Sequence, residues 1–361
     1  MKDKDIIGLI ILFLAGLGCF IANSQGAGSA IFIIAVLLFL VGLVLLIKGG
    51  DWFVDGASAI AEKFKVPEIL IGATVVSIGT TLPEVMVSSQ AAAKGNSGIS
   101  YGNAIGSIIC NVSLIAAITL AVKPAKTKRK SMIVPVAFFF IAAIFYSLTA
   151  YLSGNFTRVT GIVLLMIFVV YMVVVVIQAL KAKNNPEEDG APAEEGEEKE
   201  KEMPIFKAIL LLVFGAAIIA FGATLLVDNG TIIAQKIGVP DSVIALTVVA
   251  LGTSLPELVT AITSLIKGHG SLSLGNIIGA NLFNLVLVSG LAITIRPFSV
   301  PSEKMFLNTS LNSSLVVDIP LMIGVMLILT LPPLLKEKLY RWQGILLLML
   351  YAGFCVFQFV A

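Results

Sequence analysis

The chain has 361 residues, of which 58% are hydrophobic and 13% are charged, and its formal net charge is +2. Soluble domains of this length carry roughly twice that share of charged residues, so a protein built around one water-soluble core is excluded. The small net charge says little, and no nucleic-acid partner is implied. The apolar runs are long enough to cross a bilayer, which takes about 20 residues each.

Eleven apolar segments are predicted to be membrane-spanning helices. The first, residues 6–22, resembles a signal sequence in its Lys-bearing start and its exit at Ala22-Asn23-Ser24. Its apolar stretch is long for a signal sequence, which favours an uncleaved helix. The other ten are predicted at residues 30–48, 68–93, 99–122, 132–152, 158–180, 205–227, 241–266, 271–293, 314–331 and 343–360.

A six-residue segment occurs twice among these spans. Gly79-Thr80-Thr81-Leu82-Pro83-Glu84 is matched, 173 residues later, by Gly252-Thr253-Ser254-Leu255-Pro256-Glu257. The same offset relates Val66-Pro67 to Val239-Pro240, Gly102-Asn103 to Gly275-Asn276, and Asn111 to Asn284. Ionisable groups inside a membrane are costly and usually functional. A duplicated pair of Gly/Pro-interrupted apolar segments therefore indicates the binding site of a transporter.

The distribution of Lys and Arg predicts the orientation. Lys126, Lys128, Arg129 and Lys130 mark the loop at 123–130 as cytoplasmic. Alternation from that loop leaves only five basic residues outside: Lys94, Arg158, Lys236, Arg296 and Lys304. With five spans in each set, the two copies enter the membrane from opposite sides. The repeat is then inverted, and a pseudo-twofold axis in the membrane plane brings Glu84 and Glu257 together near the midplane.

The predicted fold class is therefore an all-α polytopic membrane protein, with ten core helices as two inverted five-helix repeats and an extra N-terminal helix. Residues 1–25 form the N-terminal helix or signal sequence, 26–180 the first repeat, and 204–361 the second. Residues 181–203 are predicted to be a disordered cytoplasmic linker, because 184–202 contain nine acidic residues with Pro and Gly. A weak calcium-attracting role for this linker is the alternative.

The duplicated motif predicts a cluster of oxygen atoms. A proline inside a helix removes a backbone donor, and we expect the carbonyls about four residues upstream, assigned to Thr80 and Thr253, to lose their partners. Hydroxyls, carbonyls and the two carboxylates would share one small volume, and Asn111 and Asn284 can add amide oxygens. The glycines 102, 106, 275 and 279 are expected to let the neighbouring helices approach closely, although they also fit a simple packing stripe.

This oxygen-rich set suits a hard cation. Calcium takes six to eight oxygen ligands, and two ionised glutamates balance its charge. The three cysteines are far apart in apolar runs, and His269 is expected to be solvated in a short Gly-flanked loop. With no cysteine or histidine among the candidate ligands, zinc and copper are disfavoured.

Both copies resemble the α-repeats of the sodium/calcium exchanger family within the cation/calcium antiporter superfamily. The resemblance implies alternating access to one ion-binding region, with sodium entry driving calcium export across the plasma membrane. It implies that Glu84 and Glu257 bind both ions and that Thr80 and Thr253 supply carbonyl and hydroxyl oxygens. It also implies that five further residues line the sodium sites on either side of this centre: Ser77, Thr81, Ser107, Ala250 and Ser254. Helices near 31–62 and 205–235 resemble the pair that slides to switch access.

Two positions depart from parts of that family. Asn284 replaces the Asp of potassium-dependent exchangers, which argues against potassium cotransport. Ala280 stands where many members have Ser, so one sodium-site hydroxyl is missing. No cofactor and no protein partner are implied; the ligands are the transported calcium and sodium ions, and the surroundings are the lipid bilayer.

Three other interpretations remain open. A buried glutamate can hold a proton at neutral pH, so a proton/calcium antiporter on the same fold is the first rival. The hydroxyls of the motif favour sodium, because a proton does not require extra neutral oxygens. A passive cation channel is less favoured than a carrier by the inverted repeat. A hydrolytic enzyme is disfavoured because no nucleophile–base pair is apparent.

Overall fold

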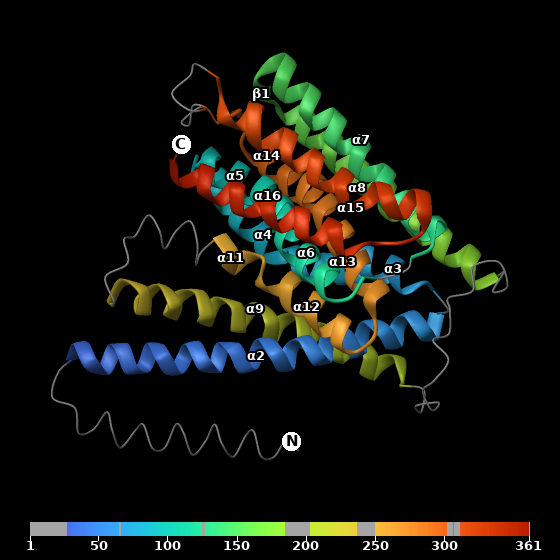
Figure 1. Ribbon diagram of the computed structural model, residues 1–361, viewed down its shortest axis with the longest axis horizontal. Coiled ribbons are helices and arrows are strands. Elements are labelled where there is room, and N and C mark those ends of the chain that lie inside the picture. The colour runs from blue at the N-terminus through green and yellow to red at the C-terminus, as the bar shows by residue number, and fades with distance from the viewer. Residues whose placement is uncertain are drawn as a thin grey trace.

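The computed structural model describes residues 27–64, 66–124, 127–184, 203–236, 250–301, 306 and 311–360. The predicted N-terminal helix, most of the acidic linker and residues 241–249 of the span at 241–266 lie outside these residues. Within them the chain is helical almost throughout (Figure 1). Eight helical segments of the described part are long and apolar enough to cross a membrane, so the polytopic all-α class is confirmed.

The first half contains α2 (Ala27–Phe64) and two spans that each include a π-helical turn. One runs through α3 (Glu68–Ile71), η1 (Gly72–Val76) and α4 (Ser77–Ala93), and the next through α5 (Ser97–Cys110), η2 (Asn111–Ala116) and α6 (Ala117–Val122). Then follow α7 (Arg129–Ser153), the short strand β1 (Asn155–Phe156) and α8 (Arg158–Asn184).

The second half repeats the order of the helical spans, but its strand comes before the fourth span and not after it. It contains α9 (Ile205–Lys236), then α11 (Ala250–Thr253) and α12 (Leu255–Ile266). The next span is α13 (Gly270–Phe283), η4 (Asn284–Val288) and α14 (Ser289–Ile295), followed by strand β2 (Phe298–Ser299). The last spans are η6 (Ser314–Asp318) with α15 (Ile319–Lys336), and α16 (Arg341–Val360).

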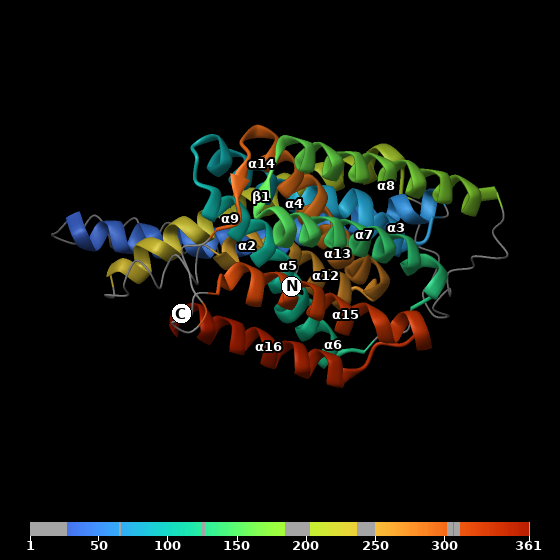
Figure 2. The ribbon, with the colours of Figure 1, turned by 90° about the horizontal axis from the view of Figure 1, so that it is seen from above.

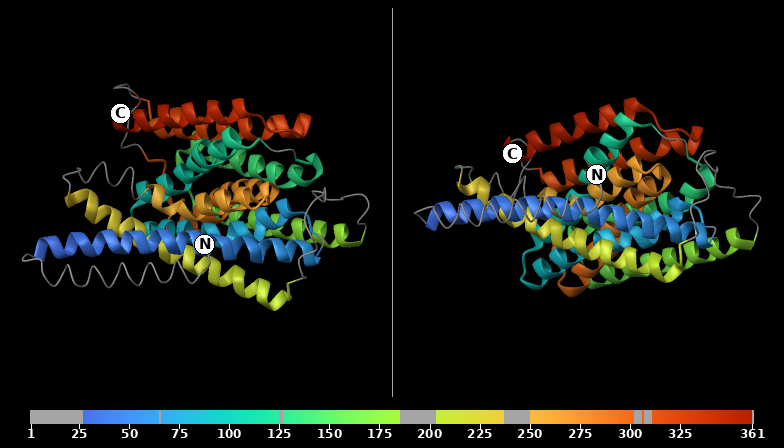
Figure 3. Two further views of the ribbon diagram at one scale, coloured as in Figure 1. Left: turned by 60° about the horizontal axis from the view of Figure 1, so that its bottom comes forward. Right: turned by 90° about the horizontal axis from the view of Figure 1, so that it is seen from below.

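Helices α2 and α9 form an antiparallel pair along one side of the molecule (Figures 1 and 3). Their contact follows small residues at seven-residue intervals, namely Gly42, Gly49 and Gly56 on α2 and Ala208, Gly215 and Gly222 on α9. A Cβ atom placed on Gly56 would lie 2.6 Å from the carbonyl oxygen of Ala208, and one on Gly215 would lie 2.6 Å from the backbone nitrogen of Phe53. Because these residues have no side chain or only a methyl group, the backbones of the two helices come into contact.

The apolar span predicted at 30–48 ends too early, whereas the long helix near 31–62 that the family resemblance implies is confirmed. Helix α2 continues to Phe64, because its small-residue face keeps packing on α9 after charged residues appear in the sequence. One of those charges, Asp55, is paired: Lys267 Nζ lies 2.6 Å from its carboxylate and 3.5 Å from that of Asp51.

The other helices surround α13, which lies in the centre of the bundle. Every residue from Leu272 to Phe283 is buried, and α13 packs on α3, η1, α4 and α7 of the first half as well as on α12. Figure 2 shows α8 and α16 at opposite edges of this arrangement. The core therefore joins both halves of the chain and does not divide into two independent units.

Contacts between the connecting loops agree with the predicted alternation. The carbonyl and the carboxylate of Glu337 accept hydrogen bonds from the backbone N–H groups of Thr127 (3.1 Å) and Arg129 (3.0 Å). These two loops were both predicted inside. At the opposite ends of the helices, β1 pairs antiparallel with β2, with Asn155 opposite Ser299, and both strands fall in connections predicted outside.

The expectation that His269 is solvated is wrong. Only about a third of its side chain is exposed (32%), and its Nδ1 lies 2.6 Å from the carboxylate of Glu68 at the start of α3. The hydrogen bond that His269 donates to Glu68 raises the pKa of the imidazole above its usual value. The loop between α12 and α13 is thus held to α3 by this pair and to α2 by Lys267.

Candidate ion-binding site

The two motif glutamates are brought together from the two halves of the chain. Glu84 lies on α4 and Glu257 on α12, both have no exposed surface, and their carboxylates interact electrostatically. No hydrogen bond of normal length and angle reaches their four carboxylate oxygens from the residues described, although the hydroxyls of Thr80 and Thr81 lie close enough to act on Glu257. Two unpaired carboxylates in the interior of a membrane protein are costly without a counter-charge.

Two neutral oxygens lie beside the Glu257 carboxyl. The hydroxyls of Thr80 and Thr81 interact with the Glu257 carboxyl across the two repeats. Four buried polar side chains near the motifs have atoms that form no hydrogen bond with any described residue: Thr81, Ser254, Asn111 and Asn284. Buried polar atoms normally have partners. A cluster of unpartnered oxygens around two carboxylates therefore fits a bound cation.

The two prolines act differently on the backbone. Helix α4 continues through Pro83, whereas the second copy is interrupted at Ser254, so that α12 begins at Leu255 with Pro256 in its first turn. In α-helical geometry the carbonyl that loses its donor at Pro83 is that of Gly79, not Thr80. The prediction of a disturbed turn is thus confirmed for the second copy, and the assignment of the freed carbonyl in the first is corrected.

The asparagines mark a second irregularity that the sequence did not reveal. The π-helical turns η2 and η4 begin at Asn111 and Asn284, which are related by the repeat offset. The hydroxyl of Ser289 donates to the carbonyl of Asn284 (3.0 Å) and closes the second of these turns. Turns of this kind often occur at functional sites, and here they set where both fully buried amides lie.

The remaining predicted positions are partly described. Ser77 is buried after η1, and its hydroxyl donates to the carbonyl of Gly72 at 2.7 Å. Ser107 is buried on α5. Ala250 begins α11, and its side chain lies outside the described part of the structure.

The expected close approach at the glycines is confirmed in the second repeat only. A Cβ on Gly279 would lie 2.5 Å from the Cα of Ala73, and one on Gly275 would overlap the backbone of Ile69. No described atom lies within 4 Å of a Cβ placed on Gly102 or Gly106. The close approach at those two glycines stays a prediction, since 237–249 are outside the described residues.

Two asparagines next to the site were not selected from the sequence. Thr80 Oγ1 donates to Asn276 Oδ1 at 3.2 Å, and Thr253 Oγ1 donates to Asn103 Oδ1 at 3.3 Å. Each bond joins one repeat to the other. The recurrence of Gly-Asn at the repeat offset was the available signal, but nothing in the sequence identified the partners.

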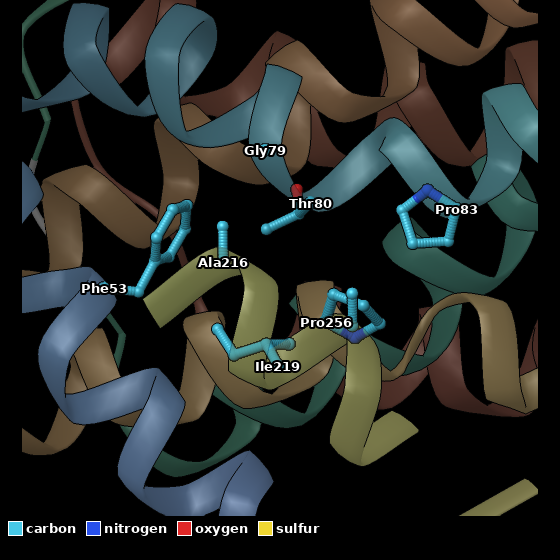
Figure 4. A pocket seen from close by; sticks show the side chains of 8 residues that line it. Phe53, Gly79, Thr80, Pro83, Ala216, Ile219 and Pro256 are labelled. Atoms are coloured by element: carbon cyan, nitrogen blue, oxygen red, sulfur yellow. The ribbon is translucent and has the colours of Figure 1, made fainter. Parts of the chain in front are cut away.

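A narrow crevice separates the motif helices from the α2–α9 pair (Figure 4). Its lining comes from both sides: Phe53, Gly79, Thr80, Pro83, Ala216, Ile219, Ala220 and Pro256. Both motif prolines face it, and it is too narrow to hold a water molecule. Beside the crevice the first motif touches both helices of the pair, since a Cβ placed on Gly79 would lie 3.1 Å from the Phe53 ring and 3.7 Å from the Ala216 side chain.

The composition of the site limits its chemistry. Among the residues that the structure describes, no group of three or more His, Cys, Asp or Glu side chains could hold a metal ion. The candidate ligands are two carboxylates with hydroxyl, amide and carbonyl oxygens, which are the donors that hard cations prefer.

Comparison with known proteins gives the family. The profile of the sodium/calcium exchanger protein family matches residues 34–177 and 207–360, which include both motifs. The chain belongs to the sodium/calcium exchanger family. It is thus an antiporter-type ion transporter of the membrane, and the resemblance found in the motifs is confirmed.

Relatives are similar over nearly their whole length. The sodium/calcium exchanger MaX1 of Methanosarcina acetivorans is 35% identical over 355 residues, covering 90% of this chain and 98% of the relative. An uncharacterized membrane protein of Methanocaldococcus jannaschii is also 35% identical, over 88% of this chain and 96% of its own. The solved structure of the sodium-calcium exchanger NCX_Mj, soaked with Na⁺ and Sr²⁺, matches with a TM-score of 0.72 at 32% identity, over 89% of this chain and 97% of that one.

Proposed function

We propose that this exchanger carries sodium and calcium in opposite directions through the oxygen cluster around Glu84 and Glu257. The observation that carries the proposal is the pair of fully buried carboxylates, one from each repeat, whose oxygens accept no hydrogen bond of normal geometry from the described residues. One calcium ion balances both charges. Sodium ions can replace it, because the surrounding hydroxyls and amides supply extra neutral ligands without adding charge.

The proposed ligands are those that the family resemblance implies. Glu84 and Glu257 bind both ions, and Thr80 and Thr253 supply oxygens to the same centre. Asn111 and Asn284 contribute amide oxygens, while Ser77, Thr81, Ser107, Ala250 and Ser254 line the flanking sodium positions. The unpartnered atoms of Thr81, Ser254 and both asparagines support this assignment.

Alternating access is proposed to come from movement of the α2–α9 pair over the motif helices. The close glycine contact between α2 and α9 supports their motion as one body. The crevice at Phe53, Pro83 and Pro256 is the surface that such a movement would cross. Inverted repeats around a shared site are the usual basis for this type of mechanism.

Further details of the proposal concern the ions and the direction. Asn284 brings no third carboxylate to the site, which favours potassium-independent exchange. The inward sodium gradient of most cells would drive calcium out across the plasma membrane, which in a bacterium or archaeon is the inner membrane. No step requires a cofactor.

The test is calcium flux in proteoliposomes under an imposed sodium gradient with pH clamped. Calcium uptake into sodium-loaded vesicles is expected to require the sodium gradient and to continue with a protonophore. Replacing both Thr81 and Ser254 with Ala is expected to weaken the sodium dependence more than calcium binding.

The proton/calcium antiporter remains the principal rival. Uptake driven equally well by a pH gradient in the absence of sodium would reject sodium coupling and favour that rival. A passive channel would instead be favoured if calcium entered the vesicles without a sodium or proton gradient and the rate rose with calcium concentration without saturating.

A further inference from the structure

Asn103 and Asn276 occupy equivalent places in the two repeats and reach across to the opposite motif. Asn276 on α13 accepts a hydrogen bond of 3.2 Å from the hydroxyl of Thr80 on α4. Asn103 on α5 accepts one of 3.3 Å from the hydroxyl of Thr253 on α11. The partners are 196 and 150 residues apart in the chain. This exchanged pair of bonds ties Thr80 and Thr253 each to an asparagine of the other repeat.

The orientation of the Asn103 amide is fixed by its other bonds. Its Nδ2 donates to the carbonyl of Glu84 (3.3 Å) and to the hydroxyl of Ser88 (2.9 Å). A carbonyl can only accept, so the Nδ2 group must face Glu84 and the Oδ1 atom must face Thr253. In Asn276 the Oδ1 atom occupies the equivalent position, facing Thr80 and also Ser77 at 3.3 Å.

A threonine hydroxyl has one proton and two lone pairs. When the proton is donated to an asparagine, the lone pairs remain available to a cation. Thr80 also interacts with the Glu257 carboxyl. Without an asparagine acceptor, its proton would be free to turn to that carboxylate and compete with a cation for the same oxygen.

We propose that Asn103 and Asn276 are positioning residues that hold the protons of the Thr253 and Thr80 hydroxyls away from the carboxylates and so set the ion affinities of the site. This inference rests on the proposed ion-binding role of the two threonines. Groups that orient metal ligands in this way typically change metal affinity 10- to 100-fold when they are removed.

The two asparagines are not equivalent in every respect. Asn276 also contacts Ser77, whose hydroxyl lies 3.0 Å from the Asn276 carbonyl oxygen and 3.3 Å from its Oδ1. At the position equivalent to Ser77 the second repeat has Ala250, which cannot supply the corresponding hydroxyl to Asn103. Loss of Asn276 should therefore weaken sodium binding more than calcium binding, whereas loss of Asn103 should weaken both ions more evenly.

The test uses Asn276→Leu and Asn103→Leu in the full-length protein, each alone and combined with Thr80→Val or Thr253→Val. Half-saturating sodium and calcium concentrations are measured by exchange in proteoliposomes. Ion-dependent thermal stabilisation in detergent gives a second measure of binding. Each Leu variant is expected to raise at least one half-saturating concentration by about tenfold. When the threonine that bonds to the substituted asparagine is already replaced by valine, this change in the half-saturating concentration should be smaller by about fivefold or more.

Asn281→Leu is the matched control. Asn281 is a fully buried asparagine on the same helix, and its amide donates to the sulfur of Met326 (3.3 Å) rather than to a motif threonine. It should lower stability without changing the ratio of sodium to calcium affinity. If Asn276→Leu behaves like Asn281→Leu, or if its effect is undiminished in the Thr80→Val background, the positioning role is wrong.

Failure of the proposed function would look different. A wild-type protein that does not exchange sodium for calcium would reject the function, whatever the variants do. The thermal measurements would still show whether the asparagines set cation affinity. If Asn276→Leu does not fold, Asn103→Leu decides the question, since it reports the symmetric bond at a partly exposed position.

Discussion

At the scale of single residues, the burial of two carboxylates at Glu84 and Glu257 is energetically costly. Both carboxylates are fully buried and accept no hydrogen bond of normal geometry from the residues described. Such a pair is tolerated when a cation supplies the missing charge. The same pair should destabilise the ion-free protein, so binding and stability are linked at this site.

We expect Glu84→Gln and Glu257→Gln each to abolish exchange while the protein still inserts and folds. Removing one of two balancing charges should weaken calcium binding by at least about 100-fold, since breaking a buried charge pair costs about 3–5 kcal/mol. Calcium should raise the melting temperature of the wild type in detergent but not that of either variant. The exposed Glu62→Gln serves as the control. Near-normal flux in a purified Glu84→Gln or Glu257→Gln protein would remove these residues from the site.

Asn284→Asp should change ion dependence more than folding. The new carboxylate would lie near two others, so the site would favour either an added proton or an additional cation. Exchange should then become more sensitive to pH or responsive to potassium, both measurable as flux at fixed sodium and calcium gradients. Unchanged pH and potassium dependence at normal expression would place Asn284 outside the ion cluster.

At the scale of helices, the glycine contact between α2 and α9 has little tolerance for side chains. We expect Gly215→Val to separate the two helices and destabilise the protein by about 1–3 kcal/mol, as overpacking usually does. The reason is that a Cβ there would meet the backbone nitrogen of Phe53 at 2.6 Å. Gly353→Val on α16 is the control, since no described atom lies within 4 Å of that position. Equal melting temperatures for the two variants would contradict the tight contact.

The pair of His269 and Glu68 predicts a pH dependence of stability. The pKa of His269 is raised in the folded protein. The His269–Glu68 pair therefore makes its full contribution to folding stability at pH values below about 6.5, the pKa of histidine in an unfolded chain. That contribution is lost as pH rises through the folded pKa. Lys267, Asp55 and Glu68 are the charged groups that act on the imidazole.

Thermal unfolding from pH 5.5 to 9 should therefore show a melting temperature that falls by about 1–3 °C more in the wild type than in His269→Gln. The effect is small because the pair is about one third exposed. A parallel pH dependence in the two proteins would mean that the pair contributes nothing to stability.

At the scale of the whole molecule, the two halves depend on each other. Helix α13 of the second half is buried against α3, η1, α4 and α7 of the first. Thr80 and Thr253 each donate a hydrogen bond to an asparagine of the other repeat. The site therefore exists only when both halves are packed together, and neither half is expected to bind ions alone.

The acidic segment at 184–202 joins these halves, and all but its first residue lie outside the described part of the chain. Its composition predicts a tether, so removal of residues 187–195 should leave the exchange rate within about twofold of the wild type. The measurement is sodium-driven calcium flux at saturating and at limiting calcium. A loss of calcium affinity in the folded deletion variant would instead reveal a regulatory site.

The membrane class, the repeat and the main candidate ligands could be predicted from the sequence, because each depends on local chemistry. Long apolar runs must be helices in lipid, and Glu84 and Glu257 are recognisable because a charge there is costly wherever the helix packs. The equivalence of Asn111 and Asn284 also follows from the repeat offset alone.

Other features were decided by tertiary contacts. The length of α2 depends on its packing against α9, the partner of His269 lies 201 residues away, and the π-helical turns at Asn111 and Asn284 leave no composition signal. The bonds from Thr80 to Asn276 and from Thr253 to Asn103 join residues at least 150 positions apart. A single sequence states which polar groups must find partners in the membrane, but only the packing of the two halves selects those partners.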